Sequence, residues 1–269
     1  MVVLCANAKR RNLTQSCPVL RRGSTRLTLN ARTSLVRRLG ARVAVFMATS
    51  VIYTSSVSGG TTDDAPFHCY LTWQNDPTST LTLNFHTVGA HESPEVRFDV
   101  VSRDGSPAAY TYSVEARTHT IPGLDAFDGA QRYIHVAEMT GLTPDRVYYF
   151  IVGSQDGGYT PQQSVRLPSR DINDLIFVAG GDMSTTAAVP GLLSAAAAES
   201  PRFAVIGGDI AYEDGRLENW PLWDQWLSDW QTFMITPEGH SVPMILAIGN
   251  HEVFGGYQQY DDAFGRGPV

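Results

Sequence analysis

Three short apolar runs in the last third of the sequence constrain the fold most strongly. They are residues 175–181, 203–208 and 242–248, each of the length of a buried strand. Between the first two, residues 187–199 are Ala-rich and have a helical pattern. Strand, helix and strand in this order, with both strands apolar on two faces, predict a βαβ unit in a parallel sheet.

A second helix is predicted between the second and third runs. Asn219 is placed to cap its N-terminus, and Pro221 suits the first turn, where its missing N–H group is not needed. Trp223, Trp226 and Trp230 follow at three- and four-residue steps. This spacing puts the three indoles on one helix face and favours core packing over a ligand platform.

Residues 66–170 have a different period, in which apolar and polar residues alternate. Strand-like runs with turn residues between them are residues 81–85, 96–100, 110–114, 133–139 and 147–152. About six or seven short strands in roughly 100 residues predict a β-sandwich. Leu142, Pro144 and Tyr148 resemble the corner motif of fibronectin type III-like domains, in which the Tyr hydroxyl group bonds back to the backbone near a strand entry.

The histidines and the cysteine of this segment carry no pattern of a metal site. Five of the seven histidines lie here without metal-ligand spacing, and we expect most of them on strand surfaces. They are His68, His86, His91, His119 and His135. Cys69 is expected to be a small buried hydrophobic residue. With Cys5 and Cys17 the cysteine count is odd, which excludes a disulfide framework.

The first 65 residues form a basic segment with no clean apolar period. Ten of the 20 Lys and Arg residues and none of the 27 Asp and Glu residues precede Asp63. We therefore predict a disordered tail or targeting segment at residues 1–65, followed by an acidic folded part that does not bind nucleic acid. The apolar residues 43–53 follow three arginines and resemble the core of a secretory signal; an export signal, a transit peptide and a start codon placed too far upstream all stay open. No apolar run reaches about 18 residues, so no membrane-spanning helix is expected.

Each of the three buried runs is followed by a residue with a metal-ligand side chain: Asp182, Asp209 and Asn250. The carboxyl ends of parallel strands are where open α/β sheets bind ligands, so these side chains are expected to converge on one crevice. Carboxylates, an amide carbonyl, the phenol of Tyr212 and the imidazole of His251 suit hard or borderline cations such as iron, manganese or zinc. The glycine before each ligand residue allows a tight turn and a close approach of the backbone to an anion.

In order, the three motifs resemble the calcineurin-like metallophosphoesterase superfamily and, within it, the purple acid phosphatases. The motifs are Gly181-Asp182, Gly208-Asp209-Ile210-Ala211-Tyr212 and Gly249-Asn250-His251-Glu252. Two residues after the first Asp, the superfamily has a metal-binding His, and purple acid phosphatases usually have Gly. This sequence has Ser184 at that place. Those phosphatases instead have a Tyr three residues after the second Asp, and Tyr212 holds that place. A fibronectin-like domain before the catalytic domain is also the plant and bacterial arrangement of the family, so the resemblance covers residues 66–269.

The resemblance implies a fold and a cofactor. The fold is an all-β, fibronectin III-like sandwich at residues 66–170, followed by the N-terminal half of an α/β metallophosphoesterase domain at residues 171–269. The cofactor is a binuclear metal centre of Fe(III) with Fe, Zn or Mn, which hydrolyses small phosphomonoesters.

The resemblance also implies roles for the motif residues. Asp182 and Tyr212 are expected to bind the first metal, Asp209 to bridge both metals, and Asn250 to bind the second. His251 is expected beside the leaving group as a proton donor or oxyanion stabiliser, oriented by Glu252.

Part of the family pattern is not found in this sequence. The family has three later histidines, one in a Val-x-x-His motif and two in Gly-His-x-His, and no histidine follows His251 here. We therefore expect the chain as given to be incomplete and inactive. Two alternatives stay open: a non-catalytic binding protein that uses the β-sandwich, and a phosphodiesterase with the same metal core. The natural substrate, the second metal and the oligomeric state are not indicated by the sequence.

Overall fold

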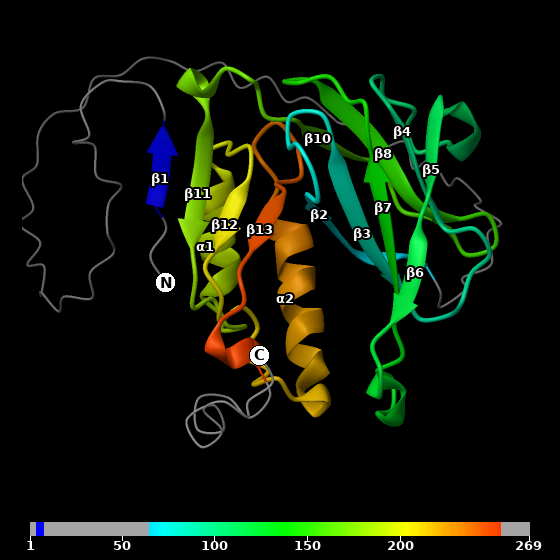
Figure 1. Cartoon of the computed structure of the whole chain (residues 1–269), viewed down its shortest axis with the longest axis vertical. Helices are drawn as coiled ribbons and strands as arrows, with labels where there is room; N and C mark the ends of the chain where they lie inside the picture. Colours follow the sequence, from blue (N-terminus) through cyan, green and yellow to red (C-terminus); the bar gives the residue numbers. More distant parts are fainter. Residues whose placement is uncertain (1–3, 8–64, 254–269) are drawn as a thin grey trace, which may run out of the picture. The chain divides into compact units, whose positions relative to one another are not determined.

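The computed structural model describes residues 4–7 and 65–253, which form three β-sheets and two α-helices. Two of the sheets are antiparallel and come from residues 67–166. The third sheet and both helices come almost entirely from the residues that follow (Figure 1).

The antiparallel sheets have four and five strands. The first, in the order β2-β3-β7-β6, contains β2 (Phe67–Thr72), β3 (Leu81–Thr87), β7 (Tyr133–Met139) and β6 (Arg117–Thr120). The second, in the order β10-β8-β4-β5 with β9 beside β8, contains β10 (Gln163–Arg166), β8 (Val147–Ser154), β4 (Glu95–Asp99), β5 (Tyr112–Glu115) and β9 (Gly158–Tyr159). Short 3-10 helices interrupt the loops at Pro107–Ala109 (η1) and Leu124–Ala126 (η2).

One hydrophobic core is shared by these two sheets. Leu83 and Phe85 of β3 are fully buried, as are Val96 of β4 and Phe150 of β8 in the other sheet. Alternate residues of each strand point into the space between the sheets, because successive side chains of a strand point to opposite faces. The predicted β-sandwich is therefore present.

The predicted tyrosine corner is also present. The backbone N–H group of Thr143 donates a hydrogen bond of 2.8 Å to the hydroxyl oxygen of Tyr148. Leu142 packs in the sandwich core beside the corner. The contact fixes the entry into β8 by joining a side chain of that strand to the loop before it.

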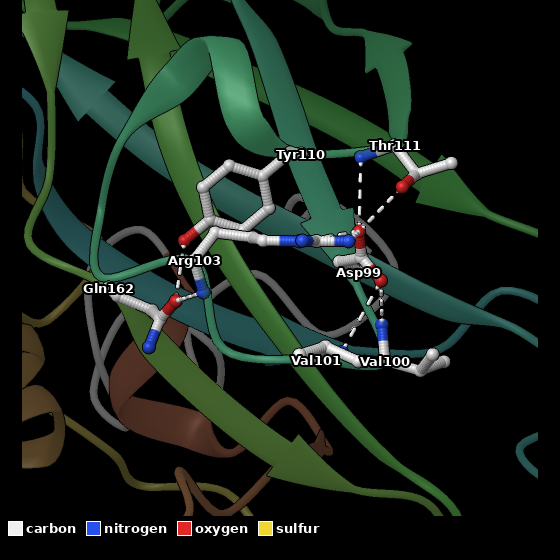
Figure 2. Close-up of polar contacts among 7 residues, drawn as sticks. All are labelled: Asp99, Val100, Val101, Arg103, Tyr110, Thr111 and Gln162. Atoms are coloured by element: carbon white, nitrogen blue, oxygen red, sulfur yellow. Dashed lines mark hydrogen bonds and ion pairs between the residues drawn. The ribbon is translucent and has the colours of Figure 1, made fainter.

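A buried carboxylate organises the loop that leads from β4 to β5. Asp99 is 2% exposed and accepts hydrogen bonds from the N–H and hydroxyl groups of Thr111 and from two nitrogens of Arg103 (Figure 2). The side-chain oxygen of Gln162 accepts two more bonds, from the backbone N–H group of Arg103 and from the hydroxyl group of Tyr110. Hydrogen bonds to a charged group are stronger than neutral ones, so this loop is held firmly at both ends.

The histidines of the sandwich differ from the expectation that most lie on strand surfaces. Four have buried side chains: His68, His86, His91 and His135. His135 lies between the hydroxyl groups of Thr87 and Thr118, each 2.8 Å from a ring nitrogen. Burial lowers the pKa of His135 to about 4, because the charged form is disfavoured away from water. Hydroxyl partners on neighbouring strands make this burial possible, and a two-residue period does not predict them.

The third sheet contains the three predicted strands in parallel. They are β11 (Ile176–Gly180), β12 (Ala204–Ile206) and β13 (Met244–Leu246), with β12 in the middle. Helix α1 (Val189–Ala197) connects β11 to β12, and α2 (Trp220–Phe233) precedes β13 (Figure 1). Short 3-10 helices lie at Ile172–Asp174 (η3), Leu217–Asn219 (η4) and Asn250–Glu252 (η5).

A fourth strand, β1 (Leu4–Asn7), joins this sheet. It pairs antiparallel with β11, with Leu4 opposite Ala179. The sequence predicts a disordered tail here, but the free backbone groups at the edge of β11 can pair with any extended segment. The rest of the basic segment, including the possible export signal at residues 43–53, lies outside the described residues.

The two helices and the parallel strands enclose a second core. Trp226 and Trp230 are buried and stacked, with their ring centroids 5.3 Å apart, which confirms the predicted core packing of the indoles. Asn219 does not cap α2 with its side chain, which donates instead to the carbonyl oxygen of Glu213 at 3.0 Å.

Cys69 is buried, as expected. Among the described residues, no helix has both the length and the apolar character needed to cross a bilayer.

Candidate metal centre

The candidate site lies in the loops that follow β11 and β12 and in η5 after β13. The first loop runs beside the second, because the backbone N–H groups of Asp182 and Met183 donate to the carbonyl oxygens of Gly208 and Asp209 at 3.1 and 2.9 Å. These hydrogen bonds lie beyond the strand ends and hold the first two motifs together.

The second motif also contacts the third. The backbone N–H group of His251 donates to Oδ1 of Asp209 at 3.1 Å. The N–H group of Gly215 donates to the carbonyl oxygen of His251 at 3.2 Å. All three sequence motifs therefore meet at the carboxyl ends of the parallel strands, as the sequence predicts.

Non-glycine residues with left-handed backbone conformation gather in these loops. Asp182 and Asp209 both have φ of 50°, and Ser184, Tyr212 and Asp214 have φ of 61°, 63° and 60°. This conformation is strained for residues with a Cβ atom, and such strain gathers at functional sites because the surrounding structure holds it in place. The presence of five such residues in these loops is consistent with a backbone that directs their side chains into a site.

The phenol of Tyr212 is directed at the first motif. Its hydroxyl group donates to Oδ1 of Asp182 at 3.3 Å, and its ring stacks on that of His251 with centroids 4.2 Å apart. Partial burial raises the pKa of the Tyr212 phenol, and the negative charges of Asp182 and Asp209 raise it further. In the metal-free site the phenol is therefore a protonated donor.

The imidazole of His251 has a different partner from the one expected. Its Nδ1 atom is hydrogen bonded to the carboxylate of Asp214. Glu252, expected to orient His251, uses its carboxylate to accept hydrogen bonds from backbone N–H groups of the second and third motifs. Asp214 follows Tyr212 by two residues, but nothing in the sequence spacing indicates that it reaches His251.

Asp182 and Tyr212 bring two oxygen donors of the predicted ligand set together. Two oxygens bound to one tetrahedral ion at about 2.0–2.2 Å would lie about 3.3–3.6 Å apart, and the two oxygens here are 3.3 Å apart. Asp182 and Asn250 are exposed to solvent, so an ion can approach them. Within residues 4–7 and 65–253, no group of three or more His, Cys, Asp and Glu side chains could hold a metal ion. A site here therefore depends on the phenol and on the amide oxygen.

Comparisons with known proteins point to one family. Residues 66–167 match the family model for the N-terminal domain of purple acid phosphatases. The fold is similar to that of purple acid phosphatase PPD1 from seeds of yellow lupin (Lupinus luteus), with a TM-score of 0.53 and 19% sequence identity. That match covers 71% of this chain and 36% of the lupin chain.

The other comparisons add little. The structure of Astrotactin-2, a conserved vertebrate-specific and perforin-like membrane protein, matches with a TM-score of 0.28 and 13% identity, over 40% of this chain and 22% of that chain. This likeness is too weak to inform the fold. No curated protein matches the sequence.

Fold and site together define a class of protein: a β-sandwich domain followed by parallel strands whose carboxyl ends carry acidic and phenolic side chains. Within this class, residues 66–167 are similar to the N-terminal domain of purple acid phosphatases, and the lupin structure shows a similar fold.

Proposed function

We propose that this protein is a metal-dependent phosphoester hydrolase of the purple acid phosphatase type, which acts on phosphomonoesters. One observation carries the proposal: the hydroxyl group of Tyr212 bonds to the carboxylate of Asp182, although the two residues are 30 positions apart in the sequence. An Asp that caps a helix or stabilises a turn bonds to backbone groups close to it in the sequence. Neither of these structural roles explains why the phenol of Tyr212 is directed at the distant carboxylate of Asp182.

Four side chains are the proposed metal ligands. Asp182 and Tyr212 would hold the first ion, Asp209 would be shared by both ions and Asn250 would hold the second. Oxygen ligands of this kind suit Fe(III) paired with Fe, Zn or Mn. When bound, the two ions would supply a nucleophilic oxygen at neutral pH and would neutralise charge in an in-line displacement.

His251 is the proposed proton donor to the leaving group. Asp214 holds the ring through Nδ1, and Nε2 is the proposed donor to the substrate. The stacked ring of Tyr212 restricts rotation of the imidazole from one side. These contacts give the imidazole one orientation, as a general acid requires.

Titration of the full chain with ferric iron tests the metal assignment directly. A phenolate bound to Fe(III) absorbs visible light, and this absorption gives the family its purple colour. We expect wild-type protein to develop a visible band and Tyr212→Phe to bind iron without it. Tyr112→Phe, at an exposed tyrosine of the sandwich, is the matched control and should keep the band. An iron-bound wild-type protein without a band, or a band retained in Tyr212→Phe, would contradict the proposal.

The same titration, together with an assay of phosphoester hydrolysis, separates the proposal from the two alternatives. A binding protein that uses only the β-sandwich should bind no iron at residues 182–252. If metal-loaded protein hydrolyses bis(p-nitrophenyl) phosphate faster than p-nitrophenyl phosphate, the site belongs to a phosphodiesterase with the same metal core.

A further inference from the structure

The carboxylate of Glu252 ties together two loops of the site. Oε2 accepts hydrogen bonds from the backbone N–H groups of Gly249 at 2.7 Å and Asp209 at 2.8 Å, and Oε1 accepts one from Ile210 at 2.6 Å. Asp209 and Ile210 follow β12, whereas Gly249 and Glu252 follow β13. One side chain therefore joins the second motif to the third through three bonds.

These bonds satisfy backbone groups that the sheet does not pair. β12 ends at Ile206 and β13 at Leu246, so the three N–H groups lie beyond the ladder. A buried or half-buried N–H group without an acceptor costs free energy, and a carboxylate is a stronger acceptor than a carbonyl oxygen. Glu252 also lies three residues after Gly249, where a Glu side chain can reach back to the first N–H group of a helical turn.

The loops approach so closely that small shifts are costly. A Cβ atom on Gly249 would lie 2.2 Å from Oδ1 of Asp209, and one on Gly208 would lie 2.6 Å from the backbone nitrogen of Gly249. Asp209 is held here in the left-handed conformation. The direction of its carboxylate therefore depends on how the two loops are fixed to each other.

We propose that Glu252 is a positioning residue of the site, which fixes the backbone of Asp209 against the loop that carries Asn250 and His251. The role rests on the proposed function, because Asp209 and Asn250 are the proposed ligands whose spacing it sets. Both carboxylate oxygens of Glu252 accept hydrogen bonds from backbone N–H groups, and the imidazole of His251 bonds to Asp214 instead.

The substitution Glu252→Gln in the full chain tests the role, because an amide keeps one acceptor oxygen but places an NH₂ group against an N–H donor. Hydrogen exchange of the metal-free protein, followed by NMR, should show faster exchange at the amides of Asp209, Ile210 and Gly249 by at least about 10-fold. Amides of β3 and β8 should keep wild-type protection and so report that the protein is folded. Glu218→Gln, at an exposed glutamate before α2, is the matched control and should change neither readout.

Ferric iron affinity is the second readout. Groups that orient ligands typically contribute about 10–100-fold to metal affinity, and we expect a loss of this size in Glu252→Gln. Gly249→Ala, which keeps the carboxylate but separates the same loops, should lose affinity to a similar extent. Unchanged exchange at the three amides in folded Glu252→Gln would overturn the positioning role. If wild-type protein binds no iron while the exchange result holds, the proposed function fails and the link between the loops stands.

Discussion

The Nδ1 atom of His251 is hydrogen bonded to the carboxylate of Asp214, which lies 37 residues earlier in the chain. This contact joins the third motif to the end of the second and gives the proposed proton donor a fixed orientation. Asp214 has a left-handed backbone, so the turn after Tyr212 is shaped to bring its carboxylate back towards η5.

Removal of the imidazole should affect substrates unequally. In metal-loaded protein that turns over phosphoesters, His251→Ala should slow alkyl phosphates by about 10²–10⁴-fold, because a general acid matters most when the leaving alkoxide is a strong base. The activated ester p-nitrophenyl phosphate should lose less. The measurement is kcat for both substrates, with His119→Ala, at an exposed histidine of β6, as the control. Equal losses would mean that His251 positions phosphate rather than protonating the leaving group.

Removal of the negative charge of Asp209, the proposed bridging ligand, should weaken metal binding. Asn tolerates the left-handed conformation of Asp209, so Asp209→Asn removes a negative charge with little change in the backbone. We expect metal affinity, measured by isothermal titration calorimetry, to fall by at least about 10-fold. Asp145→Asn makes the same change at a left-handed aspartate of the sandwich and should leave affinity unchanged. Equal affinities of Asp209→Asn and wild-type protein would remove Asp209 from the ligand set.

The stability of the sandwich should depend on pH through Asp99. Burial by itself raises the pKa of this carboxyl group, but hydrogen bonds from Thr111, Arg103 and Val100 outweigh it and hold the pKa well below its usual range. The Asp99 carboxylate therefore binds a proton more tightly in the unfolded chain than in the folded protein. Its contribution to the free energy of unfolding is present above about pH 4 and is lost as the pH falls towards the pKa of Asp99 in the folded protein.

Urea denaturation of Asp99→Asn at pH 7 and pH 3 checks this dependence. The variant should be less stable than wild type by about 3 kcal/mol at pH 7, because Arg103 loses its buried partner. The difference should shrink at pH 3. Asp125→Asn, at an exposed carboxylate of η2, is the control and should have little effect. A difference that is the same at both pH values would mean that the charge of Asp99 does not matter.

The sandwich should fold without the parallel sheet. All members of its core cluster lie between Cys69 and Leu167, and the core around Trp226 is a separate cluster. A protein of residues 65–170 should therefore show one cooperative thermal transition by circular dichroism and should not hydrolyse p-nitrophenyl phosphate. A broad, non-cooperative transition would show that the sandwich needs the rest of the chain to fold. Hydrolysis above background would show that the sandwich itself carries catalytic groups, which would contradict the proposed site.

Residue periodicity predicts most of the described elements. Residues 81–85 alternate between apolar and polar and lie within β3, and the apolar run at residues 203–208 contains β12. Periodicity fails where a polar group is buried against a distant partner. His135 is inside because Thr87 and Thr118 bond to its ring, and no local pattern contains that information.

The candidate site divides in the same way. The sequence by itself determined that Asp182, Asp209 and Asn250 follow strand-like runs. Apolar runs separated by helices pack side by side in parallel, so the ends of these runs lie at one edge of the sheet. Only the tertiary structure decided the partners of the side chains. Glu252 lies 43 and 42 residues from Asp209 and Ile210, and Asp214 lies 37 residues from His251. The close approach of two loops, not sequence spacing, therefore determines which carboxylate bonds to His251.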